Sequence, residues 1–136
     1  YAVAREVAMA LKGFTVVATK STVPLGTGDE VERIIREINP EADVAVVSNP
    51  EFLREGSAIG DFKKPDRIVI GLSDDRARAV MTEVYRPLYL NQAPLLFTAR
   101  RSAELIKYAA NAFLALKISF INEIADLCEV TDVDVQ

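Results

Sequence analysis

Short apolar runs alternate with amphipathic segments along most of the chain. The runs are rich in β-branched and aliphatic residues, which is typical of strands buried on both faces. They lie at residues 14–19, 44–47, 67–70 and 94–97. Apolar residues at helical spacing predict helices at residues 2–11, 27–38 and 75–85. Strands that alternate with helices predict βαβ units, and therefore an α/β fold with a mostly parallel sheet.

Local signals are expected to fix the ends of two of these helices. Gly13 follows the first helical pattern, and glycine tolerates the left-handed turn that often ends a helix. Residues 27–30, Thr-Gly-Asp-Glu, match a capping box, in which the threonine oxygen accepts a backbone N–H and the glutamate reaches back. Residues 1–7 lack the pattern of a signal peptide, and we expect the chain to begin inside a helix.

One long helix is predicted from Ser102 to Glu129, a stretch without Gly or Pro. Ser102 is a plausible N-cap residue, and the helix would be about 40 Å long at about 1.5 Å per residue. Its apolar residues lie on more than one face, so we expect it to pack against further protein on several sides. With so few strands beside it, the fold is expected to be completed from outside this chain or by a partner.

Composition narrows the function classes. The chain has 136 residues, half of them apolar, which suits one α/β unit and offers no apolar run of membrane-spanning length. A net charge of -4 and scattered basic residues argue against a nucleic-acid or anionic-membrane surface. One cysteine and no histidine leave too few parts for a disulfide framework, a zinc site or a Ser-His-Asp triad. The cytosol is the expected compartment.

The first segment with candidate chemistry is the loop at residues 20–27. It leaves the carboxyl end of a predicted strand, where open α/β sheets place their ligands, and its hydroxyls and free amides could hold a cofactor. The alternative is a capped loop that only precedes a helix. Gly26-Thr27-Gly28 is not the dinucleotide fingerprint, because Val31 stands at the third glycine position.

The second segment, residues 48–56, also follows a predicted strand. It carries Glu51 and Glu55 on either side of a Phe-Leu pair, and burial beside these apolar residues could suit a glutamate for acid/base work. The alternative is a solvated loop in which a glutamate caps a helix.

The third segment lies on the long helix. Lys107, Asn111 and Ile118 are four and seven residues apart, which places them within roughly 40° of one another. Lys107 and Asn111 stand among small apolar residues, where an anionic or oxyanionic substrate would compensate for their burial. Alternatively, both side chains reach out to solvent. Cys128 is interpreted as a core residue rather than a nucleophile, because adjacent acids disfavour a thiolate.

Taken together, residues 20–27, 49–56, 65–71 and 104–123 resemble the UDP-glucose/GDP-mannose dehydrogenase family, in the family's order and over nearly the whole chain. The motif Glu-Phe-Leu-Arg-Glu-Gly, together with Pro-Asp-Arg, is most similar to the UDP-glucose 6-dehydrogenase branch. The GDP-mannose and UDP-N-acetylhexosamine branches remain alternatives.

The resemblance implies an internal fragment of an NAD-dependent enzyme. Residues 1–100 would be the carboxyl half of a Rossmann-like NAD-binding domain with a parallel sheet. Residues 101–136 would be the central helix region, through which such enzymes form homodimers. The reaction implied is a two-step oxidation of the C6 alcohol of UDP-glucose to UDP-glucuronate, with two NAD and a cysteine-bound thiohemiacetal and thioester.

The resemblance also implies roles for individual residues. Glu51 would act as acid and base in thioester hydrolysis, Lys107 and Asn111 would support the oxyanion and the catalytic water, and Thr22 would lie near that water. Residues implied to contact NAD are Ser21, Thr22, Val23 and Glu55. Residues implied to contact the nucleotide sugar are Glu51, Phe52, Leu53, Arg54, Glu55, Lys107, Asn111 and Ile118. No metal site is expected.

Two landmarks of the family are absent from these residues: the glycine fingerprint for the NAD pyrophosphate, and the Gly-Gly-Ser-Cys segment with the nucleophile. We therefore expect this chain alone to be inactive. A different class of function also stays open, namely a nucleotide-sugar-binding or dimerisation module without chemistry.

Overall fold

The computed structural model describes residues 1–89 and 93–134. Its four strands are β1 (Thr15–Thr19), β2 (Val44–Ser48), β3 (Ile68–Gly71) and β4 (Leu95–Thr98). Its five helices in those residues are α1 (Ala2–Ala10), α2 (Thr27–Ile38), α3 (Ala58–Lys63), α4 (Asp75–Tyr89) and α5 (Arg100–Thr131). The predicted α/β fold with a long final helix is confirmed, and each predicted strand is present within one or two residues.

The sheet is mostly parallel, as predicted, but it contains one antiparallel junction. Its strand order is β1-β2-β3-β4, with β1 parallel to β2 and β3 parallel to β4. Strands β2 and β3 meet only at their tips, where Ser48 pairs with Gly71 in antiparallel fashion. Because both tips are carboxyl ends, the two halves of the sheet direct their carboxyl ends to one place.

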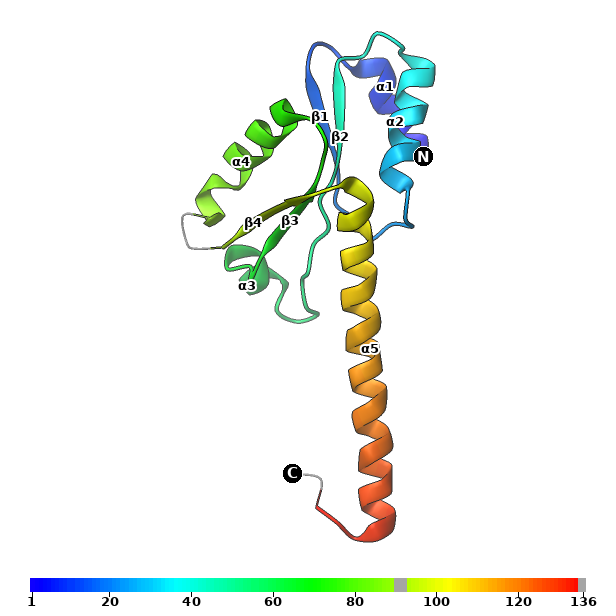
Figure 1. Ribbon diagram of the computed structural model, residues 1–136, viewed down its shortest axis with the longest axis vertical. Coiled ribbons are helices and arrows are strands. Elements are labelled where there is room, and N and C mark those ends of the chain that lie inside the picture. Colours follow the sequence, from blue (N-terminus) through cyan, green and yellow to red (C-terminus); the bar gives the residue numbers. More distant parts are fainter. Residues whose placement is uncertain (90–92, 135–136) are drawn as a thin grey trace.

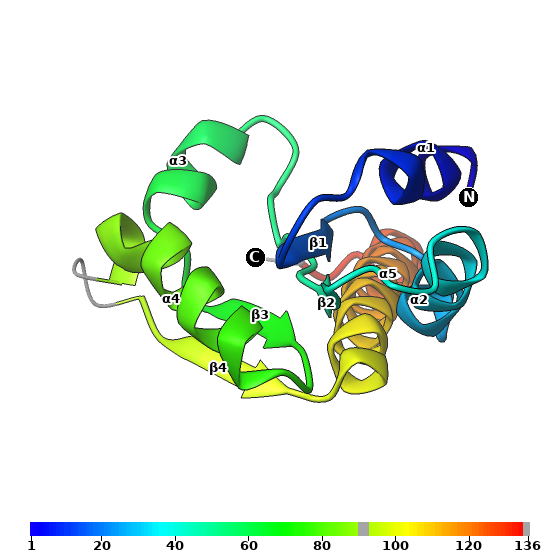
Figure 2. The same cartoon turned by 90° about the horizontal axis from the view of Figure 1, so that it is seen from above.

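Two layers of helix cover the sheet (Figures 1 and 2). Strand β2 is buried along its whole length, and alternate residues serve opposite faces, as a pleated strand requires. Val44 and Val46 join the core under α1 and α2, whereas Ala45 and Val47 join the core under α4. This explains why the sequence of β2 is a continuous apolar run.

Helix α5 leaves the α/β body after its first turns and projects away from it (Figure 1). Ala103, Glu104 and Lys107 are its buried residues, and every residue from 111 to 123 is exposed. None of the described helices is long and apolar enough to cross a membrane.

Three predictions about helix ends are wrong. The capping box does not form: Gly26 is the N-cap of α2 without a side-chain cap, and the Thr27 hydroxyl donates to Pro24 O over 2.6 Å instead. Helix α5 begins at Arg100, so Ser102 lies inside it. Gly13 has the expected positive φ of 64°, but α1 has already ended at Ala10. The short helix α3 was not predicted.

Candidate functional site

The carboxyl ends of the strands and the start of α5 converge on one region. Thr19 and Ser48, the last residues of β1 and β2, are partners in the parallel ladder. Gly71 at the tip of β3 lies directly under α5, and a Cβ there would be only 2.6 Å from the Ala103 Cβ. Glycine is therefore required at this crossing, and the close approach places the second turn of α5 above the loops that follow β1 and β2.

Lys107 and Glu51 lie together in this region. The Lys107 Nζ is 3.5 Å from Glu51 Oε1, and the two side chains are 8% and 35% exposed. The other oxygen of Glu51 accepts the Leu53 backbone N–H over 2.7 Å, which orients the carboxylate. Lys107 Nζ is also 5.3 Å from the centroid of the Phe52 ring, so its charge has both an anionic and an aromatic neighbour. Lys107 does not reach out to solvent.

The loop after β1 faces the same lysine. Ser21, Thr22 and Val23 line a small hollow of about 10 Å³ with Ser48, Pro50, Glu104 and Lys107. Ser21 and Thr22 are exposed, so their hydroxyls can turn towards a bound molecule. All three candidate segments thus line one hollow, and the Glu51–Lys107 pair joins the second and third of them again beside it.

Glu104 is a site residue that sequence reasoning missed. Its side chain is buried, and its carboxylate accepts hydrogen bonds from the Gly26 N–H (2.6 Å), the Gly28 N–H (2.8 Å) and the Ser48 hydroxyl (3.2 Å). It supplies from α5 the N-terminal cap that α2 lacks in its own sequence. The sequence contains only a weak signal for this role, an acid near the start of a helix, because the partner segments lie far away along the chain.

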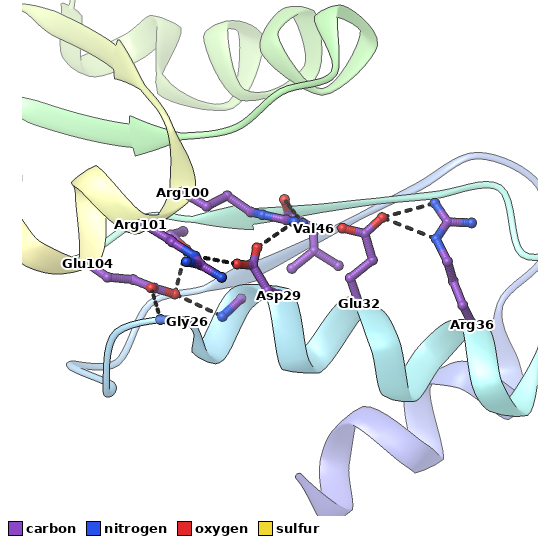
Figure 3. Close-up of polar contacts among 10 residues, drawn as sticks. Gly26, Asp29, Glu32, Arg36, Val46, Arg100, Arg101 and Glu104 are labelled. Carbon is purple, nitrogen blue, oxygen red and sulfur yellow. Dashed lines mark hydrogen bonds and ion pairs between the residues drawn. The ribbon is translucent and has the colours of Figure 1, made fainter.

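A salt-bridge cluster fastens the same two helices beside Glu104 (Figure 3). Arg100 Nη2 is 2.7 Å from Asp29 Oδ1, its Nη1 contacts Glu32, and Arg101 Nε is 2.7 Å from Asp29 Oδ2. The hydrogen bond from Arg101 and the charge of Arg100 hold the pKa of Asp29 below its ordinary value. Burial alone would raise the pKa of Glu32, but hydrogen bonds from Arg100 and Arg36 hold it below its ordinary value.

A larger cleft of about 210 Å³ opens on the other side of Glu51. Phe52, Leu53 and Arg54 line it, as do residues of α3 and the segment before β3. The Arg67 guanidinium lies 4.6 Å from the centroid of the Phe52 ring.

The cleft loop is closed by a salt bridge between Arg54 and Asp61, with Nη2 2.7 Å from Oδ1. The Arg54 side-chain and backbone hydrogen bonds lower the pKa of Asp61 to about 2.

A second polar group at the cleft was also missed. Asn49, 1% exposed, accepts at Oδ1 a hydrogen bond from Lys20 Nζ (3.1 Å) and another from the Tyr85 hydroxyl. Its Nδ2 donates to Val69 O over 2.8 Å. Asn49 therefore links the loops after β1 and β2 to β3 and α4, and it holds the backbone from which Glu51 projects.

Some predicted residues lie apart from the pair. Asn111 is exposed one turn beyond Lys107, and Glu55 is exposed on the cleft loop. Ile118, 53% exposed, lies about 16 Å along α5 from Lys107 at about 1.5 Å per residue. Cys128 is half-buried and roughly 30 Å along the helix from Lys107, so it cannot reach the pair. Among residues 1–89 and 93–134, no group of three His, Cys, Asp or Glu side chains could hold a metal ion.

Comparison with known proteins finds matches to one family over nearly the whole chain. Residues 1–89 match the NAD binding domain of the UDP-glucose/GDP-mannose dehydrogenase family, and residues 101–136 match its central domain. The chain is 78% identical to a UDP-glucose 6-dehydrogenase of Rhizobium meliloti, covering 100% of this chain and 32% of that protein. It is 48% identical to a UDP-glucose 6-dehydrogenase of Pseudomonas aeruginosa, over 99% of this chain and 31% of that one.

Solved structures of two dehydrogenases have the same fold over nearly the whole chain. A UDP-glucose dehydrogenase from Pyrobaculum islandicum superimposes with a TM-score of 0.90 at 48% identity, over 98% of this chain and 31% of that one. A GDP-mannose dehydrogenase from Pseudomonas aeruginosa gives 0.91 at 35% identity, over 98% of this chain and 32% of that one. The chain thus spans about a third of the length of the relatives it matches.

Proposed function

Because this chain belongs to the UDP-glucose/GDP-mannose dehydrogenase family, we propose that the full-length protein oxidises the C6 alcohol of UDP-glucose to the carboxylate of UDP-glucuronate. The observation that carries the proposal is the Glu51–Lys107 pair beside the hollow lined by Ser21, Thr22 and Val23. An ammonium and a carboxylate in contact at the carboxyl edge of an α/β sheet suit proton transfer and oxyanion binding.

The reaction removes four electrons in two steps. The alcohol first loses a hydride to NAD and becomes an aldehyde, which adds a cysteine thiol to give a thiohemiacetal. A second hydride leaves for a second NAD and a thioester remains, which water hydrolyses. In total, the alcohol, two NAD⁺ and one water give the carboxylate, two NADH and three protons. The cysteine would come from outside this chain, since Cys128 is too distant.

Lys107 and Glu51 would have different roles in this reaction. The Lys107 ammonium would stabilise the negative oxygen that forms at C6, and Glu51 would take a proton from the water that attacks the thioester. Asn111, one turn along the same helix, and Thr22, across the hollow, would orient that water.

The loop after β1, with its exposed Ser21 and Thr22 hydroxyls, would bind one side of an NAD molecule, which supplies the hydride acceptor when bound. Ser21, Thr22, Val23 and Glu55 would contact it there. The N-terminus of α2, a natural phosphate site, is not free, because Glu104 already accepts the Gly26 and Gly28 amides. The pyrophosphate would therefore be bound by other parts of the protein, in agreement with the missing glycine fingerprint.

The nucleotide sugar would lie along residues 51–55 and reach α5 at Lys107, Asn111 and Ile118. UDP-glucose is favoured over GDP-mannose because the relatives at 78% and 48% identity are named UDP-glucose 6-dehydrogenases, whereas the GDP-mannose dehydrogenase is 35% identical.

The proposal extends to the domains of the chain, its oligomeric state and its compartment. Residues 1–100 would form part of the NAD-binding domain, and residues 101–136 the central helix region. Helix α5 would pair with a second copy of the chain, since it exposes large apolar residues along its length, among them Phe113, Leu116, Phe120 and Ile121. We place the protein in the cytoplasm.

The test is an assay of the purified full-length protein with NAD and three sugar nucleotides in turn: UDP-glucose, GDP-mannose and UDP-N-acetylmannosamine. We expect two NADH for each UDP-glucose consumed and little reaction with the other two. Preference for another sugar nucleotide would move the protein to that branch of the family. Binding of UDP-glucose without any NADH would instead support a module without chemistry.

A further inference from the structure

The Glu104 carboxylate joins three separate segments of the site. It belongs to α5 and accepts hydrogen bonds from two backbone N–H groups at the start of α2, that of Gly26 among them (Figure 3). It also accepts a hydrogen bond from the Ser48 hydroxyl at the tip of β2. Only 4% of the residue is exposed. A buried carboxylate with three donors is held in position: Oε2 accepts from the Gly26 amide, and Oε1 accepts from both the Gly28 amide and the Ser48 hydroxyl.

The space around this carboxylate is closely filled. A Cβ on Gly28 would lie 3.0 Å from Ser48 Oγ and 3.2 Å from Glu104 Oε1. Gly28 thus allows the start of α2 to approach both groups. The short loop at residues 20–26 is therefore held at both ends, by the last residue of β1 and by the amide that Gly26 donates to Glu104.

Glu104 also stands one turn before Lys107 on the same helix, and both line the hollow with Ser21, Thr22 and Val23. The hydrogen bonds of Glu104 with the Gly26 and Gly28 amides therefore set the separation between this loop and the Lys107 ammonium. A cap that served only α2 could have come from a side chain in its own sequence, as Thr27 would usually provide.

We infer that Glu104 is a positioning residue for the reaction: it holds the Ser21–Val23 loop at the separation from Lys107 that a bound nicotinamide cofactor requires. The inference rests on the proposed function, because it assigns that loop to the cofactor. Glu104 touches neither cofactor nor substrate and acts through the loop.

The decisive variant is Glu104→Gln in the full-length protein. Glutamine has the same shape, but it loses the charge and turns an NH₂ group towards a backbone N–H, so the loop must move. We expect the dissociation constant of NADH, titrated by its fluorescence without sugar nucleotide, to rise at least about tenfold. The dissociation constant of UDP-glucose should stay within about twofold, since residues 51–55 do not contact Glu104.

The NADH titration and one further variant separate this role from a merely structural one. A cap that only stabilises α2 would lower the melting temperature and the active fraction, but the folded molecules would bind NADH as before. An unchanged NADH dissociation constant in Glu104→Gln thus overturns the inference. Ser48→Ala, which removes one donor and keeps the backbone, should weaken NADH binding in the same direction but less. If Glu104→Gln does not fold, unchanged NADH binding in Ser48→Ala overturns the inference.

Glu37→Gln is the matched control, because Glu37 is an exposed glutamate at the far end of α2 that pairs only with Arg33 in the described structure. It should leave NADH binding unchanged. If the wild-type protein binds NADH but does not oxidise UDP-glucose, the proposed function falls and the NADH titrations still decide the role of Glu104. If the wild type does not bind NADH, both fall.

Discussion

Lys107 Nζ lies 3.5 Å from Glu51 Oε1, although the two residues belong to the second turn of α5 and to the loop after β2. The contact exists because Gly71 lets α5 cross the tip of β3 closely and because Glu104 fastens the helix to the start of α2. The pair is partly exposed on the glutamate side, so a substrate can reach it and replace one of its contacts.

Lys107→Ala in the full-length protein is expected to lower kcat for UDP-glucose oxidation by about 10²- to 10³-fold, because it removes the charge proposed to stabilise the developing oxyanion. Steady-state NADH formation measures this. Lys12→Ala, at an exposed lysine between α1 and β1, is the control, and it should leave the rate unchanged. A Lys107→Ala enzyme of nearly normal rate would contradict the assignment.

Glu51→Gln is expected to block thioester hydrolysis more than either oxidation, because the amide cannot accept a proton from water. General-base loss of this kind costs about 10²- to 10⁴-fold in rate. Mass spectrometry of the intact protein after incubation with UDP-glucose and NAD should find a covalent sugar-nucleotide adduct. A normal rate without any adduct would count against the role of Glu51.

Titration of Asp61 tests the salt bridge that closes the cleft loop. The pKa of Asp61 lies at about 2, lowered from 3.8 by hydrogen bonds from Arg54. A lowered pKa means that the bridge stabilises the fold fully above pH 3.8, and that this contribution is lost as the pH falls through about 2. NMR titration of the Asp61 carboxyl should give the low midpoint, and Arg54→Ala should move the midpoint up towards 3.8. A wild-type midpoint near 3.8 would show that the bridge does not persist in solution.

Arg100→Met should destabilise the protein by about 1–3 kcal/mol, because it removes the largely buried guanidinium that Asp29 and Glu32 share. Arg33→Met is a matched control: Arg33 also pairs with two carboxylates, but it is 59% exposed, so its loss should cost much less than that of Arg100. Thermal unfolding followed by circular dichroism compares the two variants. Equal losses would mean that burial adds nothing to the Arg100 cluster.

The fold was largely predictable from the sequence, since its strands are apolar runs and its helices have apolar residues at helical spacing. The predictions failed where the deciding contact comes from far along the chain. Thr27 and Glu30 have the spacing of a capping box, yet Glu104 takes the amides at the start of α2, and Glu30 pairs with Arg33 instead. Asn49 and Tyr85 likewise carry no local signal for the hydrogen bond that they share. Lys107 and Asn111 stood out because polar residues are costly on an apolar stretch of helix, a property that one segment alone reveals.

Helix α5 is expected to form a homodimer in the full-length protein. Its large apolar residues stand in water in the single chain, and burying them against a second copy is favourable by about 25 cal/mol for each Å² of apolar surface. Phe120, 64% exposed, lies near the middle of the part of α5 that projects from the α/β body. Phe120→Glu should give monomers by light scattering. Val84→Glu on α4, at 62% exposure, is the matched control and should remain dimeric, since α4 lies on the opposite side of the α/β body from α1 and α2, away from the projecting helix. A monomeric wild-type protein would refute the role of α5, and a Phe120→Glu dimer would place the interface elsewhere.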